Sequence, residues 1–235
     1  MIKSHRIASH HIARLHGRYR AAFSEKYFRR TAILSGLFFS LSVVATSFAN
    51  SYAARKASNS VTDIILSNTR VYDTDGAIVY GAFILIAFII ALCLAHPRRT
   101  PMILYSLGLL YFIRAFFMSI THLGLYPLHT AMDFQSSIAL AMFGGGDDFF
   151  SGHAAAPFMM ALLFWNKEWL RTIFIATAAF FSVVVLLGHT HYSIDVAAAF
   201  FITYAIYHIA LKLFPREYEM FQREEKPSED LGFTL

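Results

Sequence analysis

Two polar stretches decide how this sequence folds: "GGGDDFFSGHAAAPF" at residues 144–158 and "GHTHYSIDVAAAFF" at residues 188–201. Each places ionisable side chains directly before an apolar run. An apolar run of ~20 residues is long enough to cross the ~30 Å hydrocarbon core of a bilayer as a helix. We therefore expect Asp147, His153, His191 and Asp195 to lie at the ends of membrane-spanning segments, where ionisable groups are costly to bury and usually functional.

The composition also indicates a membrane protein. Of the 235 residues, 57% are hydrophobic and only 15% are charged, whereas soluble domains carry about 25% charged residues. The sequence predicts an all-α polytopic membrane protein whose transmembrane domain, residues 31–214, is a bundle of six helices. A basic amphipathic segment, residues 1–30, precedes this domain, and a polar tail, residues 215–235, follows it. The six predicted spans cover roughly residues 31–52, 77–95, 102–122, 152–165, 170–188 and 193–213.

The distribution of basic residues predicts the orientation. Eight Lys and Arg fall in residues 1–30, and further basic residues follow the second, fourth and sixth spans. The other side holds only Arg55, Lys56 and Arg70. Because Lys and Arg accumulate in cytoplasmic loops, both termini are expected in the cytoplasm and both polar stretches on the exoplasmic side. The short loops favour a bacterial inner membrane with a periplasm-facing site, and a lumen-facing site in a Golgi or ER membrane is the alternative.

The basic N-terminal segment has a helical apolar face, formed by Ile12, Leu15, Tyr19, Phe23 and Tyr27. An amphipathic basic helix beside a membrane span is expected to lie along an anionic membrane surface. No nucleic-acid recognition motif accompanies the charge, so the sequence predicts no nucleic-acid partner.

The polar stretches carry the groups needed for phosphoryl transfer. His191 and Asp195 are four residues apart and share one face of a helix, so the carboxylate can orient the imidazole as a nucleophile or base. His153 follows Gly152 at another helix start, where backbone N–H groups favour an anion. Arg114, within the third span, offers a guanidinium whose geometry suits phosphate.

Together these stretches resemble the sphingomyelin synthase family of the lipid phosphate phosphatase and phosphotransferase superfamily. The family pattern Cys-Gly-Asp, three residues, then Ser-Gly-His is matched from Gly146 to His153, with Gly145 in place of the cysteine. The second pattern, His-Tyr-(Ser/Thr)-(Ile/Val)-Asp-Val, is matched throughout by His191 to Val196. "RAFFMSITHLGLYP", beginning at Arg114, is similar to the family's arginine-containing span.

The resemblance implies a role for each matched residue. His191 would be the nucleophile, Asp195 its orienting partner and His153 the general acid and base. Four more residues would contact substrate: Arg114, Asp147, Ser151 and Gly152. The phosphate-binding Lys-x6-Arg-Pro motif of many superfamily members is absent, and Val184 and Val185 stand where those members carry Ser-Arg. This departure favours the synthase-like branch over the phosphatases.

We therefore expect an enzyme that moves a phosphocholine or phosphoethanolamine head group from a glycerophospholipid donor to a lipid hydroxyl such as ceramide, without metal or cofactor. A lipid phosphatase or phospholipase C-like hydrolase with water as acceptor is the first alternative. A non-catalytic membrane carrier or scaffold, with His191 and Asp195 as a structural pair, is the second. His189, two residues from His191, is expected to point away from the site if both lie on a helix.

Overall fold

The computed structural model describes residues 15–127 and 149–224. Within these ranges every regular element is helical, which confirms the all-α fold class. Residues 15–24 are helical and turn into α2 through a bend at Glu25. The elements with defined bounds are α2 (Lys26–Lys56), η1 (Leu66–Asn68), α3 (Asp75–Ala95), η2 (Pro97–Arg99), α4 (Thr100–Ile120), α6 (Gly152–Leu163), α7 (Glu168–Leu187), α8 (Ser193–Leu213) and α9 (Pro215–Arg223).

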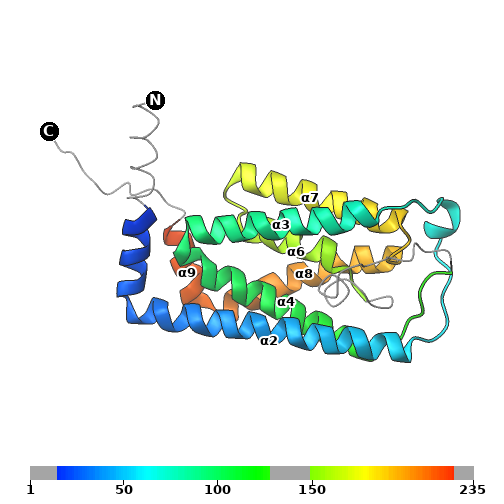
Figure 1. Cartoon of the computed structure of the whole chain (residues 1–235), viewed down its shortest axis with the longest axis horizontal. Coiled ribbons are helices and arrows are strands. Elements are labelled where there is room, and N and C mark those ends of the chain that lie inside the picture. Colours follow the sequence, from blue (N-terminus) through cyan, green and yellow to red (C-terminus); the bar gives the residue numbers. More distant parts are fainter. Residues whose placement is uncertain (1–14, 128–148, 225–235) are drawn as a thin grey trace.

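The long helices form an elongated bundle whose axes run along its length (Figure 1). The helix at residues 15–24 runs across one end of the bundle, and α9 lies at that same end. The loop that joins α2 to α3, residues 57–74, lies at the opposite end. The polar turn before α8 is at this second end, so the two ends of the bundle differ in chemistry.

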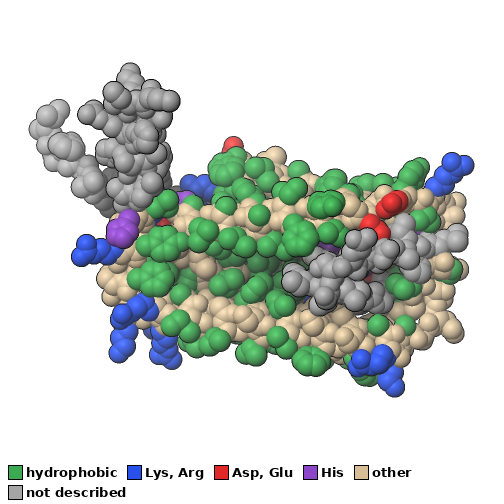
Figure 2. All heavy atoms as spheres, in the orientation of Figure 1, with side chains coloured by type: hydrophobic (Ala, Val, Ile, Leu, Met, Phe, Trp, Pro, Cys, Tyr) green, Lys and Arg blue, Asp and Glu red, His purple; other side chains and the backbone are tan. Residues whose placement is uncertain are grey.

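In the part of the chain that the structure describes, five helices are long and apolar enough to cross a membrane: α2, α3, the segment Pro97–Ile120, α7 and α8. Large apolar side chains such as Leu41, Ile84 and Phe201 lie exposed on their outer surfaces. On the face shown in Figure 2, hydrophobic side chains cover the middle of the bundle, and Lys and Arg lie towards its ends. An apolar belt of this kind is the surface expected to contact lipid.

The fourth predicted span is shorter than the others. α6 has 12 residues, which correspond to ~18 Å of helix. Nine of its residues, from Ala154 to Leu163, are buried, and it contacts α4, α7 and α8. Small side chains (Ala154, Ala155, Ala156 and Ala161) allow this close packing. α6 is therefore the central helix of the bundle, and the count of six spans stays a prediction.

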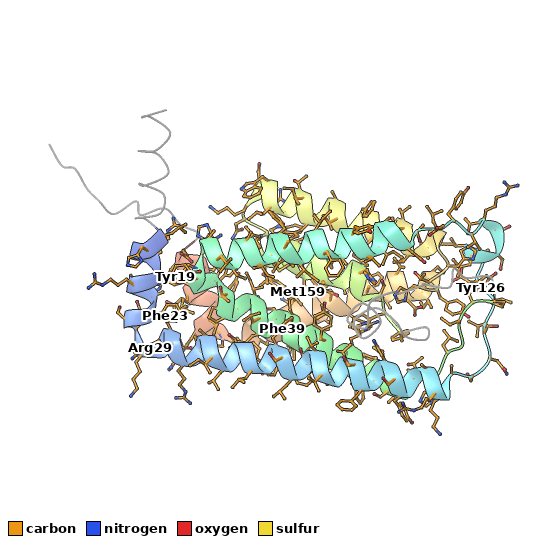
Figure 3. All side chains as sticks on the ribbon, in the orientation of Figure 1. Tyr19, Phe23, Arg29, Phe39, Tyr126 and Met159 are labelled. Atoms are coloured by element: carbon orange, nitrogen blue, oxygen red, sulfur yellow. The ribbon has the colours of Figure 1, made fainter. Side chains whose placement is uncertain are left out.

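Contacts at the first end tie the basic segment to the bundle. Arg18 donates to the carbonyl of Ala95, and Tyr19 donates to the carbonyl of Leu94. Arg98 forms an ion pair with Glu25. Figure 3 places Tyr19, Phe23 and Arg29 at this end and Tyr126 at the other. The predicted cytoplasmic basic residues thus gather at one end, although which side of a membrane that end faces stays a prediction.

Close packing of α2 on α4 depends on Gly108. A Cβ at this position would lie 2.7 Å from Phe38 Cδ1 and 3.3 Å from the Phe39 Cα. The Phe38 ring cannot easily give way, because it also packs against Tyr105, Phe112 and Phe214.

Gly108→Ala is expected to lower the free energy of unfolding by about 1–3 kcal/mol, through overpacking of the α2–α4 contact. The matched control is Gly36→Ala, because a Cβ at Gly36 meets nothing within 4 Å. Denaturant titration of both variants in the same mixed micelles measures the difference. Equal stability of the two variants would contradict the expectation.

Candidate active site

The first part of the site is the start of α8. Asp195 is fully buried, and its Oδ2 accepts a hydrogen bond from the backbone N–H of Tyr192 at 2.9 Å. The same carboxylate oxygen lies 3.8 Å from Nδ1 of His191. The predicted pair is therefore brought together, and Asp195 both caps the start of α8 and faces the imidazole. Nδ1 of His191 therefore faces the carboxylate, and Nε2 lies on the other side of the ring.

The second part of the site is the start of α6. Ser151 is the residue before the helix, and its backbone N–H donates to the carbonyl of Asp195 at 3.2 Å. This bond joins the starts of α6 and α8 directly. The Ser151 side chain is buried, and its Oγ has no hydrogen-bond partner among the described residues. A buried hydroxyl without a partner costs free energy, so it suits a site that a ligand's polar group completes.

The two histidines face each other across this junction. The ring centroids of His153 and His191 are 6.5 Å apart, with an angle of 63° between the ring planes. The His153 ring also packs against Phe181 of α7, at 5.6 Å between centroids.

The third part of the site is Arg114, which lies on α4. Only 7% of it is exposed, so this arginine does not extend to the surface of the bundle. Its Nε donates to the carbonyl of Phe150 at 3.1 Å. Phe150 has a φ of 43°, in the left-handed region that non-glycine residues seldom adopt. The fully buried Phe150 ring and this hydrogen bond hold the unusual backbone in place.

Gly152 lets the guanidinium come close to the start of α6. A Cβ at Gly152 would lie 3.4 Å from Arg114 Nε and 3.6 Å from its Cζ. The guanidinium therefore lies against the backbone that leads into His153. Arg114, Gly152 and Ser151 are close together as predicted, whereas Asp147 lies outside the described residues.

Sequence reasoning missed Asp63, in the loop of residues 57–74. Asp63 is buried, and its Oδ2 accepts a hydrogen bond from the backbone N–H of Ser193 at 2.7 Å. Burial alone would raise the pKa of the Asp63 carboxyl, but hydrogen bonds from Ser193, Leu66 and Ile65 outweigh it, and its pKa lies below the ordinary value. The carboxylate is therefore charged at neutral pH and serves as a second acceptor at the start of α8.

His189 does not lie on a helix, so the helical geometry considered for it does not apply. It lies in the turn before α8 with a φ of 52°, and it is buried. Its Nε2 is 3.3 Å from Thr69 Oγ1, and its ring packs against Tyr126 at 5.3 Å between centroids. These contacts hold the turn that carries His191 against the loop of residues 57–74 and against residues 121–127, which follow α4.

Metal ligation has no support in the described part of the chain. Residues 15–127 and 149–224 contain no cluster of three or more His, Cys, Asp or Glu side chains arranged to hold a metal ion. The expectation that the chemistry is independent of metal stays a prediction.

Comparison with known proteins supports the wider family relationship. No curated protein matches the chain. Residues 144–212 match the family described as PAP2 superfamily C-terminal. The matched segment contains His153, His191 and Asp195, the whole of α6 and α7, and α8 as far as residue 212. This part of the chain is therefore similar to the PAP2 superfamily, which suggests a lipid phosphatase- or phosphotransferase-type fold.

Proposed function

We propose that this protein is a membrane lipid phosphotransferase that works through a covalent phosphohistidine at His191. The donor is a glycerophospholipid with a phosphocholine or phosphoethanolamine head group, and the acceptor is a lipid hydroxyl such as that of ceramide. The observation that carries the proposal is the convergence of His153, His191, Asp195 and Arg114, from three helices and the turn before α8, at one end of the bundle.

In the first step Nε2 of His191 attacks phosphorus. The N–P bond forms, and the bond from phosphorus to the glycerol oxygen breaks. His153, which must be protonated when the anionic donor is bound, gives its proton to that oxygen, so neutral diacylglycerol leaves. Asp195 stabilises the positive charge that develops on the His191 ring, and the Arg114 guanidinium stabilises the charge on the phosphate oxygens.

In the second step the acceptor replaces His191 on phosphorus. His153, now neutral, takes the proton from the acceptor hydroxyl as its oxygen attacks. The O–P bond forms, the N–P bond breaks, and both histidines return to their starting states. Water can replace the lipid hydroxyl without changing any other step, so the hydrolase is the same mechanism with a different acceptor.

The test uses purified protein in mixed micelles with a head-group-labelled phosphatidylcholine or phosphatidylethanolamine. We expect a labelled sphingolipid that forms only when ceramide is present, together with acid-labile label on His191. Water-soluble label that forms equally without ceramide would replace the transferase with the hydrolase. No turnover and no labelled His191 with either donor would contradict the proposal.

Gly152→Ala is expected to reduce turnover by about 10-fold, a loss on the order of 1.4 kcal/mol in transition-state stabilisation. The added methyl group would lie in van der Waals contact with the Arg114 guanidinium and would cover part of the surface that we expect the phosphate to approach. Gly76→Ala is the control, because the nearest atom to its Cβ would be a Tyr80 ring carbon at 3.9 Å. Steady-state rates of both variants measure the effect, and equal rates would remove Gly152 from the phosphate site.

A further inference from the structure

We propose that Asp63, in the loop of residues 57–74, is a positioning residue that sets the orientation of His191 by binding the start of α8. The inference rests on the proposed function for the role of His191 as nucleophile. It adds a carboxylate from a distant loop that neither of the two polar stretches contains.

The Asp63 carboxylate is fixed at both oxygens. Its Oδ1 accepts hydrogen bonds from the backbone N–H groups of Ile65 at 2.8 Å and Leu66 at 3.1 Å. Its Oδ2 accepts from the backbone N–H of Ser193 at 2.7 Å. Leu66 is itself almost fully buried, which anchors the loop beneath the carboxylate. Asp63 therefore links the start of α8 to a loop that is itself anchored in the bundle.

Two carboxylates divide the first N–H groups of α8 between them. Asp195 takes the N–H of Tyr192, and Asp63 takes the N–H of Ser193. Carboxylates are favoured at this position because the first N–H groups and the helix dipole leave a helix N-terminus positive. Without Asp63, the Ser193 N–H would lose its acceptor, and the Asp195 carboxylate would be drawn towards it. That movement would change the 3.8 Å contact between Asp195 and His191.

A second contact from the same loop holds the neighbouring residue. The backbone N–H of Val61 donates to the Tyr192 hydroxyl at 3.2 Å, and that hydroxyl donates to the carbonyl of Gly124 at 2.9 Å. The loop thus binds both residues that follow His191, one through Tyr192 and one through Ser193. The imidazole is therefore attached to a segment that the loop fixes in place.

The test compares Asp63→Ala and Asp63→Asn with the wild type by rapid-mix labelling of His191. Asp63→Ala is expected to slow phosphohistidine formation by about 10- to 100-fold, because small displacements of a reacting group carry penalties of this size. The labelled fraction at the end of the burst and the KM for the donor should stay within about twofold. Asp63→Asn keeps one acceptor oxygen for Ser193 but sets its amide NH2 group against the N–H donors of Ile65 and Leu66, so it should recover only part of the rate. Asp73→Asn is the matched control, since Asp73 lies exposed in the same loop.

The outcomes separate positioning from simple support of the fold. A reduced labelled fraction with an unchanged rate constant would mean that Asp63 only stabilises the protein, and an unchanged rate and fraction would remove its role altogether. Either result overturns the inference.

A wild type that never labels would defeat the proposed function instead, and a substrate-free readout then decides the role of Asp63. Carbethoxylation of His191, located by mass spectrometry, should be several-fold faster in Asp63→Ala because the segment around it loosens. An unchanged carbethoxylation rate would overturn the positioning role independently of any turnover.

Discussion

Replacing His191 with alanine is expected to lower turnover by on the order of 10³-fold or more, because the variant has no group to form the covalent intermediate. The bundle should stay folded, since the hydrogen bond between Asp195 and the Tyr192 backbone does not involve the His191 side chain. Turnover of labelled donor and a denaturant titration in the same micelles measure both effects.

The matched control for this variant is His208→Ala. His208 lies on α8 as well, but it is exposed and packs only against the rings of Tyr204 and Tyr207 among the ring contacts of the described residues. It should keep near-normal turnover. Full turnover by His191→Ala would exclude the covalent mechanism, and an intact biological role in a protein with no turnover would favour the carrier or scaffold.

Replacing His153 with alanine is expected to lower turnover of the phospholipid donor by about 10²- to 10⁴-fold, the range for loss of a general acid. The size of this fall in turnover should depend on the leaving group of the donor. A nitrophenyl ester of the same head group releases a nitrophenolate that needs no proton. His153→Ala should therefore still release about one nitrophenol per enzyme in a rapid first phase, before a slow second step that lacks its base.

This comparison separates the two histidines. His191→Ala should show no rapid phase with the nitrophenyl ester, since it cannot form the intermediate. If the rate of His153→Ala falls by the same factor with the phospholipid and with the nitrophenyl ester, then His153 does not protonate the leaving group. Another residue must then be the acid.

The helix starts at the site could be predicted because local sequence determines them. α8 begins at Ser193, within the motif that contains Asp195, and α6 begins at Gly152, as predicted. The outer helix α2 was harder, because it continues through polar residues at both ends, from Lys26 to Lys56, and hydropathy marks only its apolar middle. α6 has 12 residues where the sequence predicts a span at residues 152–165, and whether it crosses the membrane stays a prediction.

The supporting residues could not be predicted from local pattern. The bond from Ser193 to Asp63 joins residues 130 positions apart, and nothing near Asp63 in the sequence marks it as different from Asp73. The place of His189 could not be predicted, because it falls between two predicted spans and its left-handed backbone turns the chain before α8 begins. Arg114 was found because a cation within an apolar span is conspicuous by itself.

The position of His153 inside the bundle has a consequence for how substrate arrives. His153 packs against Phe181, which precedes the end of α7 by six residues, so the reacting centre lies about 9 Å inside the end of that helix. In the proposed enzyme a lipid would keep its acyl chains among neighbouring lipids and approach sideways, with only its head group moving inward. Extraction of the donor into water would be unnecessary, and bilayer thickness would then control the rate by setting the depth of the phosphate relative to His191.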